Sequence, residues 1–146
     1  MAKSDSISVE PSTAQTSNHG EVLSTISNRM VQIHKRFYGK GPTKARSYIM
    51  GDLVVCLMRG GFTTAEETLI GSGRADLVHQ QRGEFQMALR HEFTTAISEA
   101  TGRRVTAFMS NSHVDPPFIV EIFVLEPESN GDRSNGDRSD GAGPSD

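Results

Sequence analysis

The longest apolar run in the chain is only six residues, and this limits what the chain can form. The run covers residues 53–58 of the 146-residue sequence. A transmembrane helix needs about 20 apolar residues, so this run is far too short to span a bilayer. A run that is apolar at every position is typical of a strand covered on both faces, and we expect one at 53–59. Cys56 lies inside this run, and we expect an unreactive core residue there.

Three further strands are expected around this run. Residues 45–50 precede it across Gly51 and Asp52, and a two-residue connection of this kind is typical of a β-hairpin. Residues 104–111 and 118–126 are rich in apolar residues and are separated by a polar, proline-containing loop at 112–117. These patterns predict a four-stranded antiparallel sheet.

Helical periodicity appears in three other segments. An apolar stripe with spacings of three and four predicts a helix at 20–38, and its members are Leu23, Ile26, Met30, Ile33 and Phe37. Thr63 and Glu66 form a capping box before a short helix at 64–70. A single long helix is expected at 74–101, with Gly102 as its C-cap. The order α-ββ-α-α-ββ predicts an α+β fold with the helices packed on one face of the sheet.

Composition divides the chain into one domain and two polar ends. Residues 1–17 are rich in Ser and Thr without periodicity, and we expect a disordered leader. Residues 128–146 contain Asn-Gly-Asp-Arg-Ser twice, and this repeat has no apolar residue, so we expect a disordered acidic tail. The domain is therefore expected at 18–127. A single cysteine and a start without an apolar signal segment favour a cytoplasmic protein, with the inner membrane face as an alternative position.

The strongest local charge is basic. Residues 35–46 contain five Lys or Arg and no acidic residue, in a chain whose net charge is −3. Within it, the loop 39–46 combines cations, glycine backbone and a hydroxyl, and its candidate binding residues are Lys40, Gly41, Thr43, Lys44 and Arg46. The spacing differs from that of a Walker A loop. The loop is either a structural turn or a site for a nucleotide, a small anion or an acidic protein. Tyr38 is the one neighbour suited to stacking a base, and we do not expect a nucleic acid partner.

Two other polar features could carry chemistry. His113 and Asp115 could orient a general base or bind a metal, but no third ligand has matching spacing, and Asp115 before Pro116 is also typical of a turn. We therefore expect no catalytic set, no metal and no cofactor. Glu121 is a carboxylate in an otherwise apolar strand. If it is buried it needs a partner such as Arg46 or Arg104; otherwise it is an edge or rim residue.

The final strand is apolar on both sides, whereas the expected helices cover only one face of the sheet. We therefore expect an open apolar face that forms a homodimer, through Phe108, Ile119, Phe123 and Leu125. The alternative is that one of the helices crosses to the second face and closes it within one chain.

Several segments between residues 20 and 127 together resemble the MpsC-like family of small soluble bacterial proteins. The resemblance is carried by the loop and strand at 39–49 (Gly-Lys-Gly-Pro-Thr-Lys-Ala-Arg-Ser-Tyr-Ile) and by 52–55, 64–66, 101–103, 111–116 and 124–127. The family is named for a sodium-translocating, membrane-potential-generating system, and it implies no catalytic residue here. It implies a non-enzymatic cytoplasmic accessory or regulatory protein of an ion- or bicarbonate-handling membrane system, with a membrane protein as a possible partner. The alternatives are a nucleotide or small-anion sensor at 39–46 and, less favoured, an enzyme that uses His113 and Asp115.

Overall fold

Two β-hairpins build the sheet of this protein, whose computed structural model describes residues 17–128. The first hairpin joins β1 (Lys44–Met50) to β2 (Leu53–Arg59) through Gly51, which has a φ of +61° that a residue without a Cβ adopts freely. The second joins β3 (Val105–Val114) to β4 (Pro117–Leu125). All pairings are antiparallel and the strand order is β1-β2-β4-β3, which confirms the predicted four-stranded sheet.

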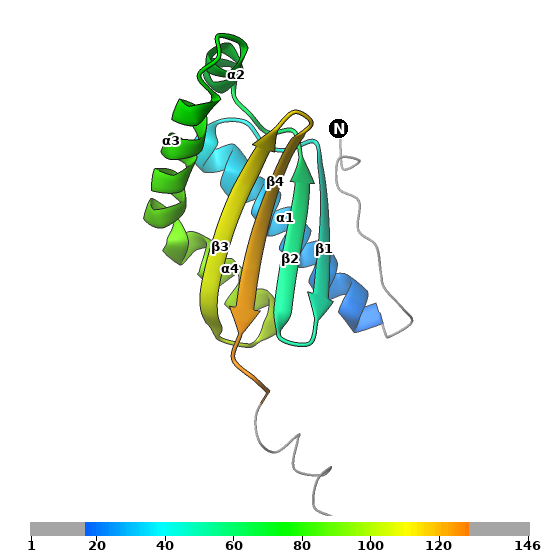
Figure 1. Cartoon of the computed structure of the whole chain (residues 1–146). Coiled ribbons are helices and arrows are strands. Elements are labelled where there is room, and N and C mark those ends of the chain that lie inside the picture. The colour runs from blue at the N-terminus through cyan, green and yellow to red at the C-terminus, as the bar shows by residue number, and fades with distance from the viewer. Residues whose placement is uncertain (1–16, 129–146) are drawn as a thin grey trace, which may run out of the picture.

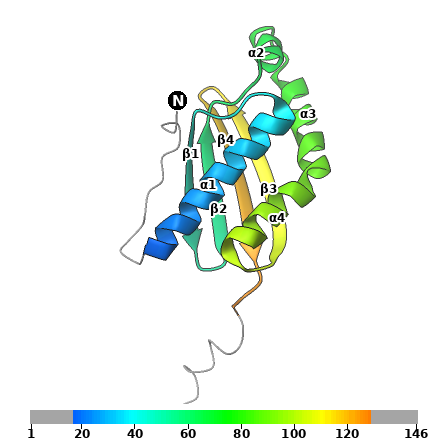
Figure 2. The same ribbon diagram turned by 180° about the vertical axis from the view of Figure 1, so that it is seen from behind.

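The helices lie mainly on one face of this sheet, as predicted. Helix α1 (Ser17–Tyr38) and helix α4 (Arg90–Thr101) cross the same face (Figure 2). Helix α3 (Ala75–Ala88) stands beside the edge strand β3, and α2 (Thr64–Gly71) lies beyond the end of the sheet (Figure 1). The predicted capping box opens α2, because Thr63 Oγ1 accepts from the Glu66 amide at 3.1 Å and Glu66 accepts from the Thr63 amide at 2.9 Å.

The prediction of one long helix at 74–101 is wrong, because the helix breaks at Leu89. This residue has φ −102° and ψ 12°, and α4 begins directly after it. A single helix of that length would measure about 42 Å, whereas the ten-residue strand β3 measures about 33 Å. The break lets α3 follow the sheet edge while α4 turns across the covered face beside α1, and the Leu89 side chain is buried at the bend. Gly102 ends α4 in the left-handed conformation, as expected.

The core lies between the sheet and the two crossing helices. Its central side chains come from α1, α4 and the inner side of the strands, and they include Ile26, Met30, Val54, Cys56, Met58, Phe93, Ile97, Phe108, Ile119, Phe123 and Leu125. Burial raises the pKa of Cys56 to about 12, so the thiol stays protonated at neutral pH. The expected unreactive character of this residue agrees with that environment.

Two predictions about the faces of the sheet are wrong. The run 53–58 was expected to be covered on both sides, but it alternates: Val54 and Cys56 are fully buried, whereas Leu57 is 38% exposed. The four residues assigned to the open face and to a homodimer lie instead under the helices; they are Phe108, Ile119, Phe123 and Leu125. Both sides of β4 are apolar, so the alternation of the strand alone could not tell which side the helices cover.

The expected domain boundaries remain predictions. The disorder predicted for 1–17 and 128–146 falls outside the described residues, except for Ser17 and Glu128 at their margins. Within the part of the chain that the structure describes, no helix has the length and apolar character needed to cross a membrane.

Candidate functional site

The sheet face turned away from α1 and α4, here called the open face, is organised in four rows of side chains across the strands. Figure 1 looks onto this face, and none of the helices within residues 17–128 covers it. The strand register places two apolar rows next to the β1–β2 turn: Tyr48, Val55, Ile122 and Met109 form one, and Met50, Leu53, Val124 and Ala107 form the other. These eight residues are called the apolar rows below.

The opposite end of the open face is basic. The outermost row there consists of Lys44, Arg59, Phe118 and His113, and Arg46 lies in the next row inward. We call Lys44, Arg46, Arg59 and His113 the basic end. The Arg59 guanidinium sits 4.9 Å from the centre of the Phe118 ring. Two shallow depressions of about 190 Å³ each flank Phe118, one over the strand β1 cations and one beside His113.

The basic end brings together two sites that the sequence analysis treated separately. Lys44 and Arg46 come from the basic loop, and His113 comes from the β3–β4 connection, yet the register of the sheet puts them on one surface. Arg59 was missed by the sequence analysis. The available signal was the hairpin itself, because a two-residue turn at 51–52 pairs Lys44 directly with Arg59.

The rest of the predicted loop is tied to the fold. The amide and the hydroxyl of Thr43 both donate to the Arg59 carbonyl, at 2.9 and 3.2 Å. Gly41 lies against α1, where a Cβ would meet the Lys35 Cβ at 3.3 Å. Lys40 is exposed at the loop. Gly41 and Thr43 therefore serve the turn, and the binding hypothesis rests on the cations.

Tyr38 is not placed to stack an external base. Its ring stacks on His34 at 5.3 Å and meets Phe85 edge-on at 4.9 Å, while the Arg82 guanidinium lies 4.3 Å from its centre. Three neighbours within the chain thus engage the ring. Burial raises the pKa of Tyr38 to about 12, and the nearby Arg82 charge offsets only part of this rise.

His113 and Asp115 do not form the acid–base pair that was one interpretation of their spacing. Strand β3 continues to Val114, so the predicted loop 112–117 shrinks to a turn at Asp115 and Pro116, whose peptide bond is cis. His113 Nδ1 donates to the Pro116 carbonyl at 2.8 Å rather than to Asp115. Among residues 17–128, no group of three or more His, Cys, Asp or Glu side chains is arranged to hold a metal ion.

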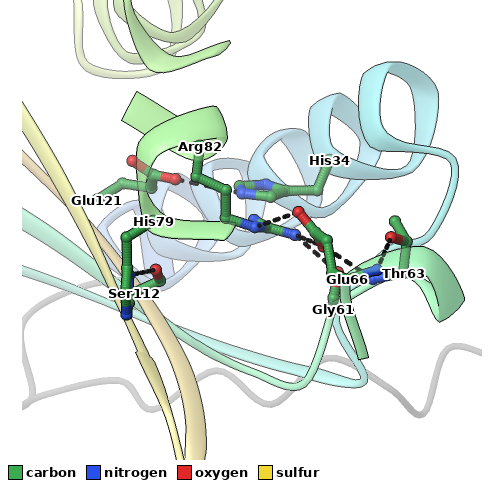
Figure 3. A network of polar contacts seen from close by, with 8 residues as sticks. All are labelled: His34, Gly61, Thr63, Glu66, His79, Arg82, Ser112 and Glu121. Atoms are coloured by element: carbon green, nitrogen blue, oxygen red, sulfur yellow. Dashed lines mark hydrogen bonds and ion pairs between the residues drawn. The ribbon is translucent and has the colours of Figure 1, made fainter. Parts of the chain in front are cut away.

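A buried ion pair, shown in Figure 3, joins three helices at the end of the sheet. Arg82 in α3 donates from Nε and Nη2 to both carboxylate oxygens of Glu66, at 3.0 and 2.8 Å, and from Nη2 to the Gly61 carbonyl at 3.1 Å. Its guanidinium lies between the rings of Tyr38 and Phe62. Both charged side chains are almost fully buried, so this geometry links α1, α2 and α3.

A second buried pair lies between the sheet and α1. His34 Nε2 is 3.2 Å from Glu121 Oε2, and the two side chains are 1% and 2% exposed. The edge or rim alternative for Glu121 is wrong, because β4 is an interior strand. A buried Glu121 has a partner, as expected, but this partner is neither Arg46, which lies on the open face, nor Arg104, which pairs with Glu126 at 2.9 Å. The sequence held a signal for His34, because it follows Met30 by four residues on the buried side of α1.

Comparison with known proteins gives one match. The family described as "Na+-translocating membrane potential-generating system (MpsC)" matches residues 18–127, from the first turn of α1 to just beyond β4. No curated protein and no solved structure matches the chain.

Proposed function

The chain belongs to the MpsC family, and from this membership we propose that it is a non-enzymatic accessory or regulatory protein of an ion- or bicarbonate-handling membrane system. It works in the cytoplasm or at the inner membrane face, and it binds an acidic surface of a membrane protein through its basic end. The family description, which names a sodium-translocating and membrane-potential-generating system, supports the membrane association.

The observation that best supports this role is that positive charges lie next to one another at the basic end. Lys44 and Arg59 are direct cross-strand partners, and Arg46 lies one row away on the same face. Like charges directly opposite in a sheet are destabilising, so this arrangement costs stability in the isolated chain. An acidic partner surface would remove the repulsion and would be attracted over a distance before contact.

Membrane cross-linking tests this proposal. The tagged chain is cross-linked in cells, and the membrane proteins recovered with it are quantified for the parent, for Lys44→Ala/Arg59→Ala and for a control, Arg74→Ala/Arg90→Ala. The control removes the same charge from the helices. We expect the basic-end variant to lower recovery of a membrane protein several-fold and the control to match the parent. Recovery of no membrane protein, or equal recovery with both variants, would contradict the proposal.

A small-anion or nucleotide sensor is the second candidate role. Its support is the depression over Lys44, Arg46 and Arg59, where three cations surround a space of about 190 Å³. A ligand at 100 times its Kd would stabilise the chain by about 2.7 kcal/mol. A thermal-shift series with phosphate, bicarbonate and nucleotides would therefore raise the Tm of the parent but not of Lys44→Ala/Arg59→Ala. An unchanged parent Tm with all three classes removes this candidate.

The apolar rows form the interface of a homodimer in this proposal. Five large apolar side chains are exposed within residues 17–128, and four of them lie on the open face: Tyr48, Met50, Leu57 and Met109. A face of four strands and seven residues measures about 19 by 23 Å. The apolar rows take up about half of this face, so a two-fold pair through them would bury about 450 Å² before the relief of the side chains is counted, the size of a weak, transient interface.

Two methionines provide a matched test of this dimer. Met109 is 48% exposed in an apolar row, whereas Met87 is 71% exposed on α3. In sedimentation equilibrium we expect the parent and Met87→Glu to be dimers and Met109→Glu to be a folded monomer. A monomeric parent at high micromolar concentration, or a dimer that survives Met109→Glu, would exclude this interface.

A further inference from the structure

A cavity outside the open face lies between α3 and the edge strand β3. Its volume is about 300 Å³, at the lower end of the range of small-molecule sites. Arg82, Gly83 and Gln86 line it from α3, Ser110 from β3, Glu121 from β4, and Tyr38 from α1. We propose that this cavity binds a small neutral molecule rich in hydroxyl or amide groups, a role separate from partner binding at the basic end.

The first support is an unpartnered buried oxygen. Glu121 is 2% exposed and lines the cavity, and its Oε1 has no hydrogen-bond partner among the residues that the structure describes. Figure 3 shows one carboxylate oxygen turned toward His34 and the other turned away from it. Buried polar atoms in native proteins almost always have a partner. A ligand that donates an O–H or N–H to Oε1 would provide one.

The second support is the charge balance of the walls. His34 Nδ1 lies 2.9 Å from the Met30 carbonyl, so this nitrogen carries a hydrogen. Nε2 has no hydrogen-bond partner within the described residues, and it faces Glu121 Oε2 at 3.2 Å. The Glu121 carboxylate thus faces an ionisable partner of opposite type on its Oε2 side, and Oε1 is the oxygen left for a ligand.

The remaining charged wall is also balanced. Arg82 is neutralised by Glu66, and the Tyr38 hydroxyl stays protonated because burial raises its pKa to about 12. His79 lies at the rim, exposed to water, and shares a hydrogen bond with Ser112 Oγ at 3.1 Å. A charged ligand would bring an uncompensated charge next to buried groups, whereas a neutral ligand would not.

The polar groups of the cavity suit a ligand that both donates and accepts. Gln86 and Ser110 offer a donor and an acceptor each. The three hydrogen bonds of Arg82 use Nε and Nη2, and Nη1 takes part in none of them. A hydroxyl or carboxamide group can donate to Glu121 and accept from such donors at the same time.

Gly83 is a position from which a side chain can be extended over the cavity. It lies in the interior of α3, where glycine is less favourable than alanine, and it shares a helix face with His79 and Gln86. A Cβ placed there would meet no heavy atom within 4 Å. A larger side chain at this position therefore has room to extend over the mouth of the cavity.

Tyrosine fluorescence can report the occupancy of the cavity. The chain has no tryptophan and two tyrosines, so Tyr38 is the only such fluorophore after Tyr48→Phe. In that background, Gly83→Leu fills the cavity and Gly83→Ala is the matched control. Each protein is titrated with D-ribose and N-methylacetamide as neutral probes and with methylammonium and acetate as charged comparators, and folding is checked by circular dichroism.

We expect at least one neutral probe to change the Tyr38 emission saturably in Tyr48→Phe and in the Gly83→Ala control, with at least tenfold weaker binding after Gly83→Leu. If Gly83→Leu loses its helical signal, Gly83→Met fills the same space with a more flexible side chain. The proposal is overturned if neither neutral probe saturates, if a charged comparator binds as tightly, or if filling the cavity leaves binding unchanged.

Discussion

The two faces of the sheet are made by the same four strands, yet they differ in what stabilises them. The covered face of β4 buries Ile119, Glu121 and Phe123 under the helices, whereas the alternate residues Val120 and Ile122 remain half-buried on the open face. Apolar character is thus a poor guide to the covered side. The cations are a better guide, because Lys44 and Arg46 must reach water and therefore lie on the open face.

The largest difference in the free energy of unfolding should appear between a buried ion pair and an exposed one. Arg82→Ala leaves the Glu66 carboxylate buried without its partner, and we expect a loss of about 3–5 kcal/mol in the free energy of unfolding. Arg74→Ala removes a similar contact, to Asp76, from an exposed site and should change stability little. Urea unfolding measures both. Equal losses of stability would mean that burial does not determine how much these ion pairs contribute to the free energy of unfolding.

Two isoleucines of β4 compare the faces directly. We expect Ile119→Ala, on the covered face, to cost about 2–5 kcal/mol because it leaves a cavity in the core. Ile122→Ala, on the open face, should cost about 1 kcal/mol or less in dilute protein. Denaturant unfolding at several protein concentrations checks this. A cost for Ile122→Ala that rises with concentration would support the dimer, and a cost equal to that of Ile119→Ala would contradict the assignment of the faces.

Alkaline pH should destabilise the covered face. The pKa of Cys56 rises from 9.0 to about 12 on folding, so the unfolded chain loses this proton first. The stability from the buried thiol is complete below pH 9 and is lost as the pH rises toward 12, by on the order of 4 kcal/mol. Unfolding experiments from pH 8 upward measure how steeply the free energy of unfolding falls with pH. Cys56→Ala should flatten it, and an unchanged slope would assign the effect to other groups such as Tyr38.

The smallest expected effect is a gain in stability at the basic end. Lys44→Ala removes a like charge opposite Arg59 and should stabilise the isolated chain by a few tenths of a kcal/mol at low salt. The gain should vanish in high salt, because mobile ions screen exposed charges. A double-mutant cycle with Arg59→Ala isolates the pair. A destabilising Lys44→Ala would remove the main support for the proposed partner surface.

Signals that act within a few residues were read correctly from the sequence. The capping box of Thr63 and Glu66, the hairpin at Gly51 and the C-cap at Gly102 each depend on neighbours in the chain. The break at Leu89 could not be read in this way, because neither glycine nor proline marks it in the sequence. The family was also recognised from local sequence patterns, which are distributed over residues 18–127.

In the candidate sites, too, single residues could be identified from the sequence, whereas their contacts with distant residues could not. The cations of the loop and the lone carboxylate Glu121 were visible as unusual residues, since charge and polarity stand out in any window of sequence. Their partners were not visible. Glu121 meets His34, and Lys44 shares a surface with His113, only because β2 pairs with β4 and α1 crosses the sheet. Pairings between distant segments depend on the packing of the whole core, and a strand that is apolar on both sides does not determine which side that core will take.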